Sequence, residues 1–135
     1  MTTQLKQPAT SPVVTTTFNA IIDGTLPSRQ DQVKTFPDNT GNANPKSFGR
    51  NSTESKVSVK LVHDGTKTPR TQYKAIIEHW MTNAKETSEL VLDFGGETIT
   101  LQGMITDITP TFRGGDATRW WIVTIAMICS SVVYS

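Results

Sequence analysis

The stretch ELVLDFGGETITLQGMITDITPTFRGGDATRWWIVTIAM, residues 89–127, decides the fold. Apolar, β-prone residues fill its first strand, and Gly95-Gly96 follows directly. A Gly-Gly pair between two apolar runs is typical of a β-hairpin, because primed turns require positive φ angles at their central residues. The stretch therefore begins with two strands joined by a tight turn.

The second strand, residues 97–108, places Leu101 and Ile105 on one face and a row of threonines on the other. Gly103 lies on the apolar face, where a glycine predicts a β-bulge or a close approach by another group. Ile108 is out of phase with that face, which also indicates a bulge.

The third strand, residues 119–129, follows a predicted loop over residues 109–116 and is apolar on both faces. Such a strand is central in a two-layer fold or covered by a neighbouring subunit. We expect it to pair with the second strand as an antiparallel hairpin that continues across a subunit boundary. Candidate interface residues in these two strands are Ile105, Arg119, Trp120 and Ile125.

Residues 68–84 predict a helix. Its apolar residues recur at helical spacing along one side: Tyr73, Ile76, Ile77, Trp80, Met81 and Ala84. Thr68 or Thr71 can cap the helix, and Pro69 is suited to its first turn. We expect the helix to lie on one face of the sheet, with Trp80 and Met81 against that face.

The first part of the chain is predicted to be more loosely organised. Residues 1–12 are polar and contain two prolines, which predicts a flexible N-terminal arm. Residues 13–22 predict one strand that ends in a turn at Asp23-Gly24, and residues 55–62 predict another. Residues 13–135 are expected to form a single domain.

Residues 27–53 are predicted to form a long loop inside that domain, because the segment is rich in Asn, Pro and Gly. A loop of this length is uncommon in a compact domain, and it is either a passive insertion or a segment that orders against a neighbour. Phe36 and Phe48 favour the second interpretation, since a solvated loop gains little from phenylalanine. Both are therefore candidate interface residues.

The composition argues against several classes of function. The 135 residues carry a net charge of +1, so no basic excess predicts nucleic-acid binding. Cys129 is the single cysteine, which excludes an intrachain disulfide and a cysteine-rich metal site. The longest apolar run is too short for a membrane helix, and the first residues do not resemble a secretory signal. We therefore expect synthesis in a cytoplasm and no membrane insertion.

The sequence also lacks a recognisable catalytic constellation. His63 and His79 form no HxH or HExxH pattern, so neither a metal site nor a cofactor is expected. Cys129 belongs to an apolar strand, where a thiol stays protonated and inert. The Gly-Gly pairs lack the lysine and hydroxyl residues of a phosphate-binding loop. We therefore do not expect an enzyme.

Together these elements predict a mainly β (α+β) fold, a small antiparallel β-barrel or sandwich with one flanking amphipathic helix. The succession of strand, helix and the three strands of residues 88–127 resembles the tail-tube fold of contractile-tailed bacteriophages and related injection machines. The resemblance implies a virion structural protein of the tail, made in the host cytoplasm, that forms a homo-oligomeric ring and contacts other tail proteins. It also implies that residues 27–53 are the loop that reaches the next ring.

One difference from that family concerns position in the tail. A strand that lines a tube lumen should alternate apolar with polar residues, whereas Thr124 alone interrupts the apolar residues of 120–128. This pattern favours a baseplate or tube-end subunit. The alternative function is a small β-barrel that binds an apolar or glycan ligand through Trp120 and Trp121. A small enzyme is the third and weakest interpretation.

Overall fold

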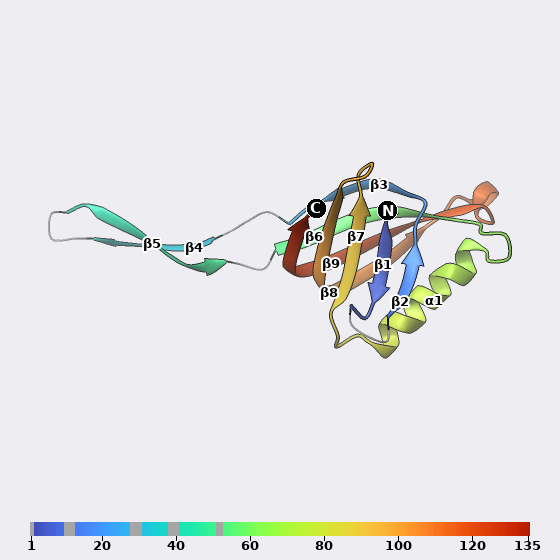
Figure 1. Ribbon diagram of the computed structural model, residues 1–135, viewed down its shortest axis with the longest axis horizontal. Helices are drawn as coiled ribbons and strands as arrows, with labels where there is room; N and C mark the ends of the chain where they lie inside the picture. The colour runs from blue at the N-terminus through green and yellow to red at the C-terminus, as the bar shows by residue number, and fades with distance from the viewer. Residues whose placement is uncertain (1, 10–12, 28–30, 38–40, 51–52) are drawn as a thin grey trace.

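The computed structural model describes residues 2–9, 13–27, 31–37, 41–50 and 53–135, and between residues 31 and 53 it describes side chains for residues 33, 35–37, 41, 42 and 45. The described part of the chain is built from nine strands, one α-helix and one 3-10 helix (Figure 1). In chain order these are β1 (Gln4–Gln7), β2 (Val14–Thr17), β3 (Ala20–Thr25), β4 (Asp31–Pro37), β5 (Ala43–Arg50), β6 (Thr53–Val62), α1 (Pro69–Thr82), β7 (Ser88–Asp93), β8 (Thr98–Thr111), η1 (Gly114–Asp116) and β9 (Trp120–Tyr134).

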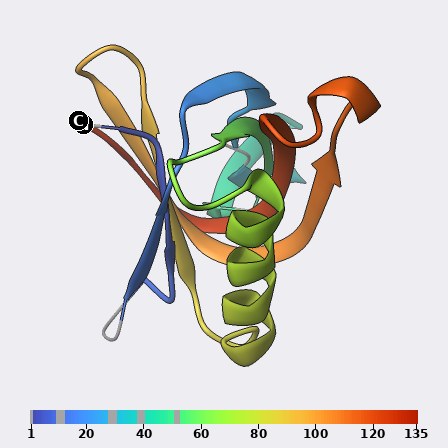
Figure 2. The ribbon, with the colours of Figure 1, turned by 90° about the vertical axis from the view of Figure 1, so that its right-hand side faces the viewer.

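Seven strands form one antiparallel sheet in the order β2-β1-β7-β8-β9-β6-β3. The sheet curls around a common interior, and α1 lies against its concave side (Figure 2). The predicted mainly β (α+β) class is confirmed. The sheet does not close into the predicted barrel, because β2 pairs with β1 alone and β3 with β6 alone, which leaves two edges.

The two edge strands β2 and β3 are joined by only two residues, Phe18 and Asn19. The Phe18 N–H donates to the Thr3 carbonyl and the Asn19 N–H to the Lys60 carbonyl, each at 2.9 Å. These bonds tie the corner to both ends of the sheet, and the chain turns there from β2 into β3 (Figure 1). The prediction of one strand over residues 13–22 is therefore wrong, because Phe18 leaves the first strand and is buried in the core.

Two further predictions for the first part of the chain are corrected. Residues 4–7 of the expected flexible arm form β1, which pairs with both β2 and β7 and buries Leu5 completely. Asp23-Gly24 is not a turn but lies within β3, beside a register shift. A Cβ on Gly24 would lie 3.0 Å from the Lys56 carbonyl oxygen, so the glycine permits close strand approach.

The β7–β8–β9 meander is confirmed. Gly95 and Gly96 have φ angles of 78° and 105° in the first turn, and β8 pairs with β9 along its whole length. The register shifts once between Gln102 and Gly103 and once between Ile105 and Asp107, as the phase changes predicted. The loop before β9 is shorter than predicted, because β8 continues to Thr111.

The core lies between the curled sheet and α1. Its fully buried side chains come from every strand of the meander and from β1 and β6, and they include Leu5, Leu61, Leu90, Leu101 and Ile125. Of the two predicted caps, Thr68 and Thr71, it is Thr68 that caps α1, since its hydroxyl accepts the Thr71 N–H. Ile76 is the helix's fully buried side chain, with Tyr73, Ile77 and Trp80 partly buried beside it. Met81 is 75% exposed, so its predicted contact with the sheet is wrong.

Candidate assembly surfaces

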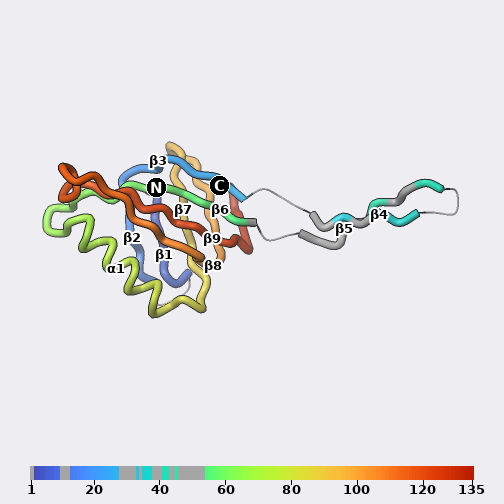
Figure 3. Tube along the Cα trace, turned by 180° about the vertical axis from the view of Figure 1, so that it is seen from behind, coloured from blue at the N-terminus to red at the C-terminus, as the bar shows by residue number. Residues whose placement is uncertain are grey.

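Residues 27–53 do not form the predicted long loop. Their described part pairs as a two-stranded antiparallel hairpin, β4–β5, with Val33 opposite Ser47 and Phe36 opposite Asn44. Figures 1 and 3 show that the hairpin extends away from the seven-stranded sheet, toward the end of the molecule opposite α1. The segment is therefore a projecting arm with its own backbone pairing.

The arm displays apolar side chains to solvent. Val33 is 56% exposed and Phe36 is 44% exposed. Phe48 belongs to β5, but its side chain lies outside the described residues. An isolated two-stranded hairpin is marginal in water, and it gains stability from a third strand or a packing surface. The arm thus presents Val33 and part of the Phe36 side chain to solvent.

The structure places two predicted interface residues in the interior. Ile125 is fully buried and Ile105 is 7% exposed, and both belong to the core of this chain. Neither side chain is available to a neighbouring subunit without unfolding. Periodicity could identify these residues as apolar, but it could not tell which face of β9 is covered by the chain itself.

Trp120 and Trp121 point to opposite faces of β9, as consecutive strand residues must. Trp121 is packed inward, where its ring stacks on Phe112 at 4.9 Å and its Nε1–H donates to the Ala117 carbonyl at 2.7 Å. Trp120 is on the outer face, with the Lys60 Nζ 5.3 Å from its ring centroid. The two indoles therefore do not form the single ligand platform predicted for a binding module.

Arg119 precedes β9 in an exposed loop, where its carbonyl accepts the His63 N–H at 2.8 Å. Trp120, the next residue and another predicted interface residue, is partly buried. Further along the outer face of β9, Ile128 is 45% exposed and lies opposite Met104, which is 36% exposed. Part of the predicted second apolar face is thus exposed in the single chain.

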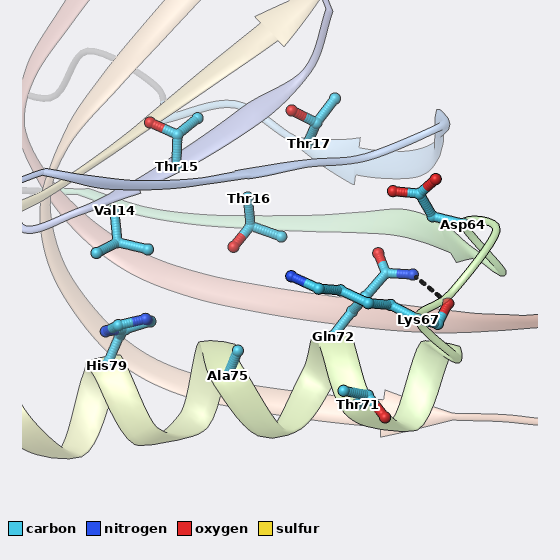
Figure 4. Close-up of a pocket in the computed structure, with 10 residues that line it drawn as sticks. All are labelled: Val14, Thr15, Thr16, Thr17, Asp64, Lys67, Thr71, Gln72, Ala75 and His79. Carbon is cyan, nitrogen blue, oxygen red and sulfur yellow. Dashed lines mark hydrogen bonds between the residues drawn. The ribbon is translucent and has the colours of Figure 1, made fainter.

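A groove separates the free edge strand β2 from α1 (Figure 4). Its volume is about 370 Å³, and its lining is mostly polar. Val14 and Thr16 point from β2 toward the helix, while Ala75 and His79 face them from α1 (Figure 4). Sequence patterns did not identify this groove, because β2 was assigned to a longer strand.

Gln7 is buried next to this groove. It lies directly opposite Val14 in the β1–β2 register, so the two side chains share a face of the sheet. Gln7 is 1% exposed, and its side-chain oxygen and nitrogen make no hydrogen bond to the part of the chain that the structure describes. An unpaired buried amide destabilises a fold.

A second cavity opens at the end of the sheet from which the hairpin departs. Its volume is about 270 Å³, and it is lined by Ile21, Asp23, Gly24, Leu26, Val57, Leu92 and Phe94. Val57 and Leu92 are core residues and form its floor, whereas Leu26 and Phe94 are 39% and 49% exposed. This cavity is the gap left between edge strand β3 and the β7–β8 turn in the open sheet.

Chemical reactivity is limited among the described residues. They contain no group of three or more His, Cys, Asp and Glu side chains placed to hold a metal ion. Burial raises the pKa of the Cys129 thiol, which keeps it protonated. Burial and, second, the Asp107 carboxylate raise the pKa of Tyr73. Within the described residues, the helix is neither long nor apolar enough to cross a membrane.

Comparison with known proteins identifies the fold. No protein-family model matches the chain, and no curated protein sequence matches it. Among solved structures, a chain of the phage p2 baseplate in its activated conformation with Sr superposes with a TM-score of 0.71 and 8% identity, over 96% of this chain. This chain spans less than half, 44%, of that baseplate chain.

Two components of an extracellular contractile injection system, PVC, are also similar. One belongs to the sheath-tube complex in the extended state, with a TM-score of 0.54, 10% identity and coverage of 99% of this chain and 88% of the other. The other belongs to the sheath/tube terminator, with a TM-score of 0.53, 10% identity and coverage of 99% and 93%. The chain therefore has a tail-tube/baseplate-type fold.

Proposed function

We propose that this chain is a virion structural protein, a ring-forming subunit of a phage tail tube or baseplate. The observation that carries the proposal is the tail-tube/baseplate-type fold over almost the whole chain, combined with a hairpin that projects beyond it. In this role the protein binds copies of itself and other tail proteins, and it performs no catalysis. Its location is the tail of the virion, after synthesis in the host cytoplasm.

The projecting hairpin supports a contact between subunits. A ring needs a heterologous interface, in which one surface of a subunit meets a different surface of the next. The hairpin lies at one end of the molecule, and its Val33 side chain is 56% exposed, so contact with an apolar surface of a neighbouring subunit would bury it. The apolar outer face around Met104 and Ile128 favours a tube-end or baseplate position, where another protein covers it.

The alternative, a small module that binds an apolar or glycan ligand, has less support. Its two predicted contact residues, Trp120 and Trp121, lie on opposite faces of β9. The apolar cavity of about 270 Å³ is below the roughly 300–1,000 Å³ of pockets for drug-sized ligands.

The proposal is tested by removing the hairpin. Residues 31–50 are replaced by a short Gly-Ser linker, and the oligomeric state of both proteins is measured by native mass spectrometry and negative-stain electron microscopy. We expect closed rings or tubes for the unaltered protein and monomers for the variant, with the two monomers melting at the same temperature because the seven-stranded sheet is intact. A protein that remains monomeric at every concentration refutes the ring-forming role.

A further inference from the structure

We infer that Asp64 is a modification site, at which aspartate isomerises spontaneously to isoaspartate in the exposed turn between β6 and α1. The chain contains two Asp-Gly-Thr sequences, at residues 23–25 and 64–66, so the residues that follow each aspartate are identical. The fold gives the two sites different surroundings, because the first lies in a paired strand and the second in a turn. The second site therefore reaches the reactive geometry more easily.

The reaction joins the Asp64 side chain to the peptide group that follows it. The Gly65 nitrogen attacks the Asp64 Cγ, a C–N bond forms, and the carboxyl hydroxyl leaves with the amide proton as water. Water then opens the resulting succinimide ring at either of its carbonyl carbons. One opening restores aspartate, and the other leaves isoaspartate, in which the main chain passes through Cγ. The water lost in the first step is regained in the second, so water is the sole co-reactant.

The turn at Asp64 leaves its peptide group room to rotate. Residues 63–67 are all exposed, and Gly65 has a φ angle of 46°, which glycine adopts readily. A Cβ built on Gly65 would meet none of the described atoms within 4 Å. The Asp64 N–H donates to the Lys67 carbonyl at 2.9 Å, and the Lys67 N–H donates to the Asp64 carbonyl at 2.7 Å. Backbone bonds in such an exposed turn open at a low cost in free energy.

The strand around Asp23 restricts the same rotation. Asp23 is also exposed, so access to water does not distinguish the two sites. Gly24 pairs with β6, and a Cβ on Gly24 would lie 3.0 Å from the Lys56 carbonyl oxygen. The Ser55 hydroxyl donates to the Thr25 carbonyl at 2.8 Å, which holds the next residue against β6 as well. A register shift precedes Asp23, but the peptide group after it cannot rotate without separating β3 from β6.

Isoaspartate at position 64 would change the connection between β6 and α1. It adds one carbon atom to the main chain of the turn and leaves the carboxylate directly on the Cα. The Lys67 carbonyl in this turn accepts the Gln72 Nε2–H at 3.3 Å, and Thr68, the cap of α1, follows it (Figure 4). Asp64 and Lys67 also line the groove between β2 and α1. The modification therefore alters the edge of this groove and the start of the helix.

The test follows both aspartates in one sample. The folded protein is incubated at physiological pH and temperature in water labelled with heavy oxygen. Brief digestion with trypsin then releases residues 7–29 and 61–67 as separate peptides. Electron-transfer fragmentation distinguishes isoaspartate from aspartate, and the label marks each residue that has passed through the succinimide. A second sample is incubated in guanidinium chloride, where the fold protects neither site, and circular dichroism verifies both states.

In the folded protein we expect labelled isoaspartate to accumulate at Asp64 at least about tenfold faster than at Asp23, because a turn opens more often than a paired strand. In guanidinium chloride the two rates should become similar, since both aspartates precede Gly-Thr. Asp64→Glu is the matched control. It keeps the carboxylate but should abolish the product at position 64, because the longer side chain closes the corresponding ring far more slowly. The rate at Asp23 should not change in this variant.

Two outcomes would overturn the inference. Equal rates at Asp64 and Asp23 in the folded protein would show that the turn does not favour the reaction. Isoaspartate at Asp64 without the oxygen label would show that it did not form through the succinimide. Neither outcome depends on assembly, because the reaction needs only the folded chain, so the ring-forming role is tested separately.

Discussion

The seven-stranded body and the β4–β5 hairpin use the same kind of backbone pairing with very different support. In the body, every inner strand pairs on both sides and contributes side chains to a common core. In the hairpin, each strand pairs with one other strand within the described residues, and Val33 and Phe36 are about half exposed. Strand pairing alone therefore does not distinguish a finished fold from a contact element. The distinction comes from what covers the side chains.

The largest contrast is expected from matched truncations of the two regions. Leu101→Ala in β8 removes a fully buried side chain and should lower the free energy of unfolding by about 2–5 kcal/mol. Val33→Ala in β4 should change it by less than about 0.5 kcal/mol, because the side chain is mostly in water. Urea denaturation of the monomeric protein measures both. A large loss for Val33→Ala would mean that the hairpin is packed within its own chain.

A second substitution measures how closely the body is packed. A Cβ on Gly103 would overlap the Ile128 carbonyl oxygen and lie 2.8 Å from the Cys129 Cα. Backbone cannot yield as a flexible side chain can, so Gly103→Ala should lower stability by about 1–3 kcal/mol. Gly115→Ala is the control, because no atom lies within 4 Å of the added methyl group. Thermal unfolding with equal midpoints for the two variants would contradict the bulge geometry of β8.

The seven-stranded body also contains Gln7, a buried amide that destabilises the fold, and replacing it should raise the free energy of unfolding. Gln7→Met removes a buried amide that has no hydrogen-bond partner among the described residues, and it keeps the length of the side chain. An unmade buried hydrogen bond costs roughly 1–3 kcal/mol, so we expect a gain of about 1 kcal/mol after some loss of fit. Gln4→Met in the same strand is the control, since Gln4 is partly exposed. Destabilisation by Gln7→Met in the monomer would show that the amide is paired.

The smallest expected effect is at the start of α1. The Thr68 hydroxyl accepts the Thr71 N–H at 3.2 Å, and loss of such a cap costs about 1 kcal/mol. Thr68→Ala should therefore lower the midpoint of chemical denaturation slightly, and Thr68→Ser should restore it. Thr66→Ala, in the exposed turn before the helix, should have no effect. Equal denaturation midpoints for Thr68→Ala and Thr66→Ala would show that the Thr68 hydroxyl does not stabilise the helix.

Sequence patterns predicted the elements whose signals are local. Three predicted features depend on neighbouring residues alone, and the structure confirms each of them. They are the Gly95-Gly96 turn, the bulges of β8 and the start of α1 at Pro69. The pairing of β8 with β9 was also found, since consecutive strands joined by a short connection usually pair. The mainly β class and the tail-tube resemblance followed from these elements.

The predictions were wrong where strands that are far apart in the sequence pair with one another. Residues 4–7 are polar except Leu5, so nothing local shows that β1 is an inner strand between β2 and β7. Val14–Thr17 and Ala20–Thr25 read as one strand until the sheet order places them at opposite edges. Ile105 and Ile125 looked suitable for an interface because periodicity does not reveal which apolar face the chain itself covers. The apolar cavity beside Phe94 forms only when β3 and β7, which are distant in the sequence, come together, so the sequence does not reveal it.

Hydrogen exchange measured by mass spectrometry, on free and assembled protein, tests most directly whether the hairpin is completed by a neighbouring copy. In the free subunit we expect amides of β4 and β5 to exchange rapidly while those of β8 and β9 are protected, because a hairpin with one partner per strand opens easily. In the assembly, β4 and β5 should become protected, and β8 and β9 should change little. The hairpin would not be stabilised by a neighbouring copy if β4 and β5 were already protected in the free subunit, or if they still exchanged rapidly in the assembly.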